Sequence, residues 1–209
     1  LDAIVRRIDD PYVGQFVASW DGWRRSARDF TWEGTGIEVK TTTGPTSSHI
    51  VQGTHQVEPL PATDAAPGED RLLLVSVGLQ QCGPSANSFT VPHLTQRIVE
   101  RLEATGNGGA VEGLLSHIAD YGSEAGFGYH HGTMSSDPPF TTCFTAAFVR
   151  AYDMCDPSVQ VLRRDDLVPH QHVDAQSLSF RVDLPGTIAV NNPVPGLQRV
   201  ADAIVGGPR

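Results

Sequence analysis

The sequence predicts a mixed α/β fold in which helices and strands follow one another without an internal repeat. Apolar residues recur at helical spacing near the N-terminus and in the middle of the chain, and they alternate with a period of two after residue 28. Residues 71–79 form a nearly continuous apolar run, which is typical of a strand buried on both faces. We therefore expect a central mixed sheet flanked by helices.

The individual elements follow from the same periods. The first helix has apolar residues at Leu1, Ile4, Val5 and Ile8 and ends before Pro11. Gly106-Asn107-Gly108-Gly109 separates two later helices. In chain order we expect a helix at 1–8, a short helix at 15–23, a β-hairpin at 29–41, strands at 48–52 and 71–79 with a loop at 59–70 between them, helices at 92–104 and 110–121, strands at 145–152, 159–162 and 177–182, and a short helix at 197–205.

The length of 209 residues suits one domain. We expect a single domain over residues 1–209, with a core at about 1–122 and a strand-rich extension at about 123–209. The chain begins with Leu1 rather than Met and carries no signal segment, so we expect its true start to be missing.

The composition of the chain bears on three kinds of function: binding of nucleic acid, contact with a membrane, and cysteine-based sites. The formal net charge of −9 opposes long-range attraction to a polyanion, so DNA contact would use local arginines such as Arg24, Arg25 and Arg28, or a basic partner. No apolar run approaches the roughly 18 residues of a membrane span, and we expect no membrane contact. The three cysteines lack the C-x-x-C spacing of zinc or redox sites, which favours a reducing cytoplasm.

The hairpin brings chemically active groups together. If its turn is centred on Gly34-Thr35, Trp32 faces Ile37, and Asp29 faces Lys40. One face is then apolar, and the other holds Asp29, Thr31, Glu38 and Lys40. Two carboxylates and an ammonium at one end of a hairpin could bind Mg²⁺ and a phosphate. An ordinary hairpin with a solvated face and surface ion pairs explains the same pattern.

Lys40 is the only lysine beside fourteen arginines. Because arginine supplies the positive charge at every other basic position, the lysine at position 40 indicates a need for a compact, rotatable ammonium. The alternative is that this lysine has been retained by chance. Since Lys40 follows Val39 rather than a glycine, a P-loop nucleotide site is excluded.

Asp29, eight intervening residues and Glu38-Val39-Lys40 resemble the motif of the PD-(D/E)xK nuclease superfamily, whose fold is restriction-endonuclease-like. The longer pattern Arg28-Asp29-Phe30, residues 37–43, His49-Ile50 and Gln56 is similar to an uncharacterised branch found among bacterial restriction and phage-defence genes. Members usually carry an N-terminal helical Glu in the metal site, whereas the first helix here offers Asp2, Asp9 and Asp10.

The resemblance implies a Mg²⁺-dependent DNA endonuclease, with Mn²⁺ as the alternative ion. Asp29 and Glu38 would bind the metal with the Val39 carbonyl, and Lys40 would orient or help deprotonate the attacking water. Thr42, His49 and Gln56 are expected to contact substrate or the metal shell. Partners would be DNA and defence subunits such as an ATPase or methyltransferase, and a homo-oligomer is left open. We expect both carboxylates to face a wet cleft, and burial of Glu38 beside Val75 would contradict the hypothesis.

Two other functions compete. The chain could be a catalytically silent DNA-binding or assembly subunit that keeps the nuclease-like fold, as the acidic charge and the absent helical Glu suggest. It could also be a zinc hydrolase, because an extended His170-x-His172-x-Asp174 would place three ligands on one side.

Overall fold

The computed structural model describes residues 1–64, 66–126, 128–138, 140–174 and 177–206. The chain divides into two compact units, each built from separate stretches of sequence. The helical unit comprises Leu1–Ser26, Gln80–Thr145 and Ala201–Arg209, and the sheet unit comprises Ala27–Leu79 and Ala146–Val200. Within the described residues, no helix is both long and apolar enough to cross a membrane.

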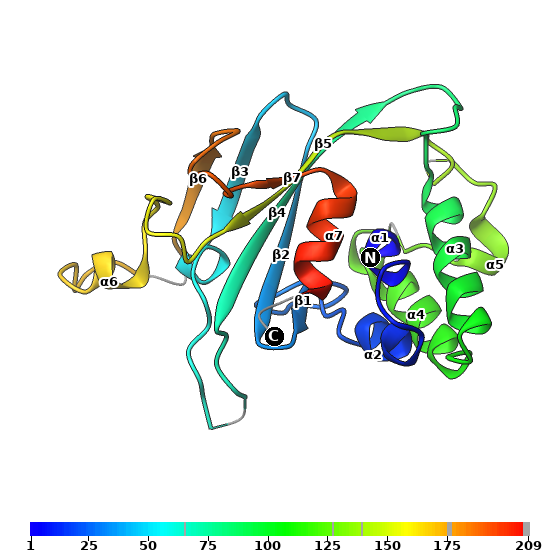
Figure 1. Cartoon of the computed structure of the whole chain (residues 1–209), viewed down its shortest axis with the longest axis horizontal. Coiled ribbons are helices and arrows are strands. Elements are labelled where there is room, and N and C mark those ends of the chain that lie inside the picture. The colour runs from blue at the N-terminus through cyan, green and yellow to red at the C-terminus, as the bar shows by residue number, and fades with distance from the viewer. Residues whose placement is uncertain (65, 127, 139, 175–176, 207–209) are drawn as a thin grey trace. The chain divides into compact units, whose positions relative to one another are not determined.

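Short and medium helices make up most of the helical unit (Figure 1). They are α1 (Asp2–Val5), η1 (Asp10–Tyr12), α2 (Val13–Ala18), α3 (Val91–Ala104), α4 (Gly109–Asp120), η3 (Ser123–Ala125) and α5 (His131–Met134); α7 (Leu197–Val205) ends in this unit. Phe16 of α2, Leu102 of α3 and Leu114 of α4 are buried. These side chains mark the core that the helical periodicity predicts.

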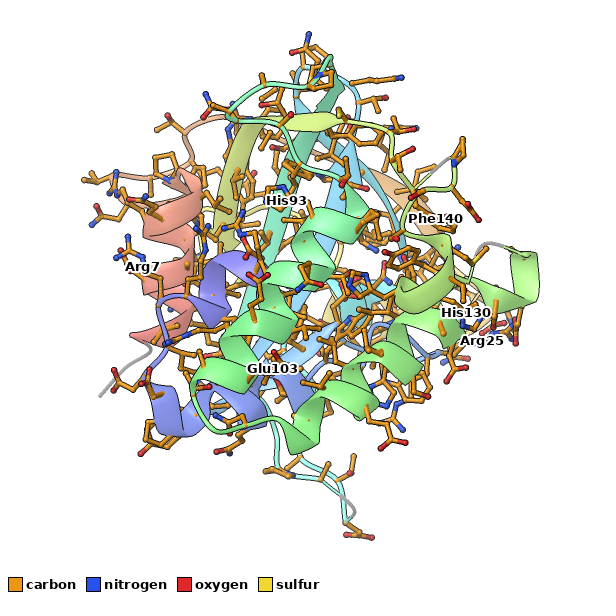
Figure 2. The ribbon with its side chains drawn as sticks, turned by 90° about the vertical axis from the view of Figure 1, so that its right-hand side faces the viewer. Arg7, Arg25, His93, Glu103, His130 and Phe140 are labelled. Carbon is orange, nitrogen blue, oxygen red and sulfur yellow. The ribbon has the colours of Figure 1, made fainter. Side chains whose placement is uncertain are left out.

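The long helix α3 lies close to its predicted bounds. The Thr90 hydroxyl accepts a hydrogen bond from the His93 N–H at 3.2 Å and so caps the first turn. Figure 2 shows His93 near the start of α3 and Glu103 near its end. Gly106, with φ of 74°, follows the helix and allows the left-handed backbone that ends it.

The second predicted helix, at 15–23, is wrong in its bounds. The helix α2 spans Val13–Ala18, and residues 19–23 are not helical. The Ser19 hydroxyl donates to the Phe16 carbonyl at 2.8 Å. A side chain that bonds the backbone in this way competes with continued helix formation.

The sheet unit contains most of a five-stranded sheet with the order β1-β2-β4-β5-β7 and a two-stranded sheet of β3 and β6 (Figure 1). β1 pairs antiparallel with β2, whereas β2 pairs parallel with β4, so the larger sheet is mixed. This confirms the predicted fold class. The elements are β1 (Phe30–Trp32), β2 (Thr35–Thr42), β3 (Ser47–Gln52), η2 (Thr54–Gln56), β4 (Arg71–Gln81), β5 (Phe144–Asp153), α6 (Arg164–Leu167), β6 (Ser179–Leu184) and β7 (Val194–Pro195).

The hairpin forms as predicted, but its register differs by two residues. Its turn is Glu33-Gly34, both with positive φ, as in the tight turns that suit two-residue hairpin loops. Phe30 therefore pairs with Ile37, and Trp32 pairs with Thr35 rather than with Ile37. A shift of two residues preserves the faces, so Phe30, Trp32 and Ile37 are all buried. β1 is an edge strand of this sheet, and β4 holds its middle position.

One face of β4 lies in the core of the sheet unit. A cluster of buried side chains joins β4 and β5 to the β3–β6 pair. Its members are Val51, Val57, Leu72, Leu74, Tyr152, Met154, Val159, Val182 and Leu184. In the parallel register Glu38 lies beside Leu74 and Lys40 beside Ser76, so both charged residues share the face of this core.

The strand predicted at 159–162 is wrong, since these residues form no regular element. Val159 is buried in the core cluster, and its N–H donates to the Asp156 carbonyl in a turn. The apolar pattern here reports burial of side chains rather than a strand.

Candidate active site

The structure brings the predicted acid pair and the lone lysine together in the sheet unit. Asp29 immediately precedes β1, while Glu38 and Lys40 lie in β2. Gln56, at the end of η2, lies beside Lys40. Residues separated by up to 27 positions in sequence thus form one polar group.

Hydrogen bonds orient the two carboxylates. Asp29 Oδ2 accepts the Val39 N–H at 2.7 Å, which ties the acid to β2. Glu38 Oε1 lies 2.8 Å from Lys40 Nζ. Within the described residues, these bonds leave the second oxygen of each carboxylate for a metal ion.

The Lys40 ammonium is held from two sides. Besides the ion pair with Glu38, Nζ donates to Gln56 Oε1 at 2.9 Å. The same Gln56 oxygen accepts the Gln52 N–H, also at 2.9 Å, which fixes the amide orientation. The Lys40 side chain is 20% exposed, so its ammonium keeps access to solvent.

Glu38 is more buried than predicted. Only 4% of the residue is exposed, so the expectation of a wet cleft is wrong at this position. It adjoins Leu74, whereas Val75 pairs with Val39 on the opposite face of the strands. The neighbouring ammonium of Lys40 offsets part of the cost of burying this charge.

Burial raises the pKa of both site carboxyls. At Asp29 the Val39 N–H and the positive charges of Lys40 and Arg28 oppose this rise in pKa. At Glu38 the rise in pKa by burial is opposed by the charge and hydrogen bond of Lys40, and the charge of Asp29 adds to it. Two partly desolvated carboxyls that repel each other are typical of functional sites.

These shifts predict a pH-dependent stability. A carboxyl with a raised native pKa holds its proton in the folded state after the unfolded chain has lost it, so the free energy of unfolding falls as pH rises. Relative to Glu38→Gln, the metal-free wild type should lose stability as the pH rises above the ordinary pKa of a glutamate, because the pKa of Glu38 is raised in the folded state. Urea unfolding of both proteins in a chelator measures this, and parallel pH profiles would contradict it.

Thr42 and His49 occupy different positions. Thr42 lies at the end of β2, half-buried, and its hydroxyl accepts the Gly44 N–H at 3.0 Å. His49 is buried, and its Nε2 lies 2.7 Å from Ser76 Oγ. Burial, followed by the charges of Lys40 and Arg181, lowers the His49 pKa. The position of His49 favours support of the strands over direct contact with substrate.

The donor set fits a hard divalent cation. Asp29 and Glu38 offer carboxylate oxygens, and their mutual repulsion would be relieved by a cation between them. Among the described residues, no group of three His, Cys, Asp or Glu side chains could hold a metal. Two carboxylates are nevertheless sufficient protein ligands for Mg²⁺, which keeps several waters and binds substrate phosphates.

The competing zinc site lacks its expected geometry. His170, His172 and Asp174 are exposed, and the Val173 N–H donates to the His170 carbonyl at 3.0 Å. This bond closes a turn, so the extended arrangement assumed for three ligands is wrong. The next residue, Ala175, lies outside the described residues.

Arg28, a neighbour of the site, does not have the position that the sequence analysis expects for it. It was expected to contact DNA with Arg24 and Arg25, which are exposed, but Arg28 itself is buried against Glu69. No sequence signal connects Arg28 with a glutamate 41 positions away. The one feature of the sequence that could have linked Arg28 to the site is its position directly before Asp29.

One family profile matches residues 4–130, a range that contains Asp29, Glu38, Lys40 and Gln56. The family is described as "Putative PD-(D/E)XK family member". We found no significant match among curated proteins or among solved structures. Because the match spans more than half of the chain and includes the site residues described above, the chain belongs to this DUF4420 family, which confirms the resemblance to the PD-(D/E)xK superfamily.

Proposed function

We propose that the chain is a metal-dependent nuclease that hydrolyses phosphodiester bonds in DNA. The observation that carries this proposal is the arrangement of Asp29, Glu38 and Lys40 on one hairpin, with Lys40 held by Glu38 and Gln56. Family membership supports nuclease chemistry with a divalent metal.

In this proposal Asp29 and Glu38 bind Mg²⁺, or Mn²⁺ in its place, together with the Val39 carbonyl. When bound, the ion supplies a nucleophilic water and stabilises charge on the attacked phosphate. Lys40 contacts the phosphate as a compact, rotatable ammonium, and it orients or helps to deprotonate that water. Gln56 sets the position of the ammonium. In this proposal Thr42 contacts the substrate.

We further propose a role in bacterial restriction or phage defence in the cytoplasm, together with subunits such as an ATPase or methyltransferase. The motif residues between Arg28 and Gln56, which resemble a branch found among bacterial restriction and phage-defence genes, support this role. The net charge of −9 also favours delivery to DNA by a partner.

A catalytically silent subunit is the second candidate. The observation that favours it is the burial of Glu38 and its close ion pair with Lys40. An ammonium that permanently occupied the metal position would leave the fold intact and the site inactive. Measurements of metal binding and of cleavage distinguish the two candidates.

We expect Mg²⁺ or Mn²⁺ to stabilise the wild type but not Asp29→Asn. A ligand at 100 times its Kd adds about 2.7 kcal/mol, which for a protein of this size raises Tm by about 5–10 °C. Melting curves with metal and with EDTA measure this shift. Asp153→Asn is the matched control, because Asp153 pairs with Arg71 elsewhere in the sheet unit.

The same samples are tested for cleavage of supercoiled, linear and single-stranded DNA at low salt. Cleavage that EDTA abolishes supports the nuclease. Wild-type melting curves that metals do not shift, together with no cleavage, would favour the silent subunit.

A further inference from the structure

Arg28 is an extensively bonded side chain next to the candidate site. Its side chain is 3% exposed, and the residue directly precedes Asp29. The guanidinium forms an ion pair with Glu69, in which Nε lies 2.8 Å from Oε1 and Nη2 lies 2.7 Å from Oε2. A charge buried to this degree requires such a partner.

Two further guanidinium bonds reach the loop that carries Gln56, while a third, from Nη1, goes to the Ala27 carbonyl at 3.0 Å. Nη1 donates to the His55 carbonyl, and Nη2 donates to the Glu58 carbonyl at 2.7 Å. These carbonyls lie on either side of Gln56 in sequence. Arg28 therefore holds the loop at two points that flank the residue bonded to Lys40.

Glu69 and Gly36 complete this arrangement. Glu69 Oε2 accepts the Leu60 N–H at 2.8 Å, which ties down the chain two residues after Glu58. A Cβ at position 36 would lie 2.7 Å from Arg28 Nε and would collide with Glu69. Glycine two positions before Glu38 thus lets the ion pair pack against β2.

We propose that Arg28 is a positioning residue of the candidate site: through the loop at 53–58 it sets the place of Gln56, and through Gln56 that of the Lys40 ammonium. The statement that this site is catalytic rests on the proposed function. The chain of contacts from Arg28 to Lys40 stands on the geometry alone.

The choice of side chain agrees with this role. A planar guanidinium with five donors can engage a carboxylate and several carbonyls at once. The three donors of an ammonium point tetrahedrally and cannot reproduce this fork. A side chain that only neutralised Glu69 would not need to bond the carbonyls of His55 and Glu58.

The test uses the lone lysine as a probe, because labelling with ¹³C-lysine yields the NMR signals of Lys40 alone. Arg28→Gln/Glu69→Gln removes both charges, so no unpaired charge stays buried. We expect the Lys40 side-chain signals to shift in this variant. The control Arg71→Gln/Asp153→Asn removes another ion pair of the sheet unit and should leave these signals in place.

A second experiment, in a variant that lacks the Gln56 side chain, distinguishes a positioning effect of Arg28 from a general loosening of the fold. In a Gln56→Ala background, the Arg28→Gln/Glu69→Gln change should produce no further shift of the Lys40 signals. Unchanged Lys40 signals in the Arg28 variant, or shifts of equal size with and without Gln56, would overturn the proposal. If the double variant does not fold, Arg28→Lys replaces it. Because this variant contains two lysines, the NMR signals of Lys40 are then assigned by comparison with Arg28→Lys/Lys40→Arg.

If the wild type cleaves DNA, cleavage assays add a second readout of the Lys40 position. A misplaced ammonium should lower kcat on the order of 10²-fold and leave KM nearly unchanged. A wild type that binds no metal and cleaves no DNA would remove the proposed function, while the NMR result would still decide the role of Arg28.

Discussion

Asp29→Asn and Glu38→Gln are each expected to lower metal-dependent DNA cleavage on the order of 10³-fold or more. Each substitution keeps the side-chain volume but removes an anionic metal ligand, and metal stabilisation of the transition state contributes several kcal/mol. The asparagine can still accept the Val39 N–H, so the fold at the start of β1 should persist. Rates measured at saturating Mg²⁺ and Mn²⁺ give the effect.

The control for these variants is Asp153→Asn, which should cleave like the wild type. Melting curves show whether activity is lost without loss of the fold. Because burial raises the pKa of Glu38, Glu38→Gln should be at least as stable as the metal-free wild type at neutral pH. Full cleavage by either site variant would mean that its carboxylate is not a ligand.

Lys40→Arg is expected to lower cleavage on the order of 10²-fold, the usual scale for a positioned proton-transfer group. The larger guanidinium cannot occupy the position 2.8 Å from Glu38 and 2.9 Å from Gln56 without displacing one of them. It also stays charged at any pH the protein survives, so it cannot help to deprotonate water. Binding of DNA, measured by fluorescence anisotropy at low salt, should survive because the charge is kept.

Arg181→Lys is the matched control for this experiment, since it exchanges the same two residue types at an exposed position of β6. It should leave cleavage unchanged. Equal rates for Lys40→Arg and wild type would remove Lys40 from the chemistry and leave it a role as the ionic partner of Glu38.

The face of each hairpin residue was predictable because side chains alternate with a strict period of two. A turn at Glu33-Gly34 instead of Gly34-Thr35 moves the pairing by two residues, which leaves Asp29, Glu38 and Lys40 on one face. The pairing itself was not predictable, because several positions near Gly34 can form a tight turn. The opposite faces of Val39 and Glu38 follow from the same alternation.

The sequence alone determined the mixed α/β class and the acid pair with its lysine, because these depend on local periodicity and spacing; the family follows from the resemblance of the motif and from the matching family profile. Only the tertiary structure decided that Glu38 is buried, that Arg28 faces Glu69 rather than solvent, and that residues 170–174 turn instead of extending. Burial and ion pairing depend on segments distant in the chain, such as β4 and the loop that ends at Glu69. No local pattern contains the position of those segments, since packing of the whole unit sets it.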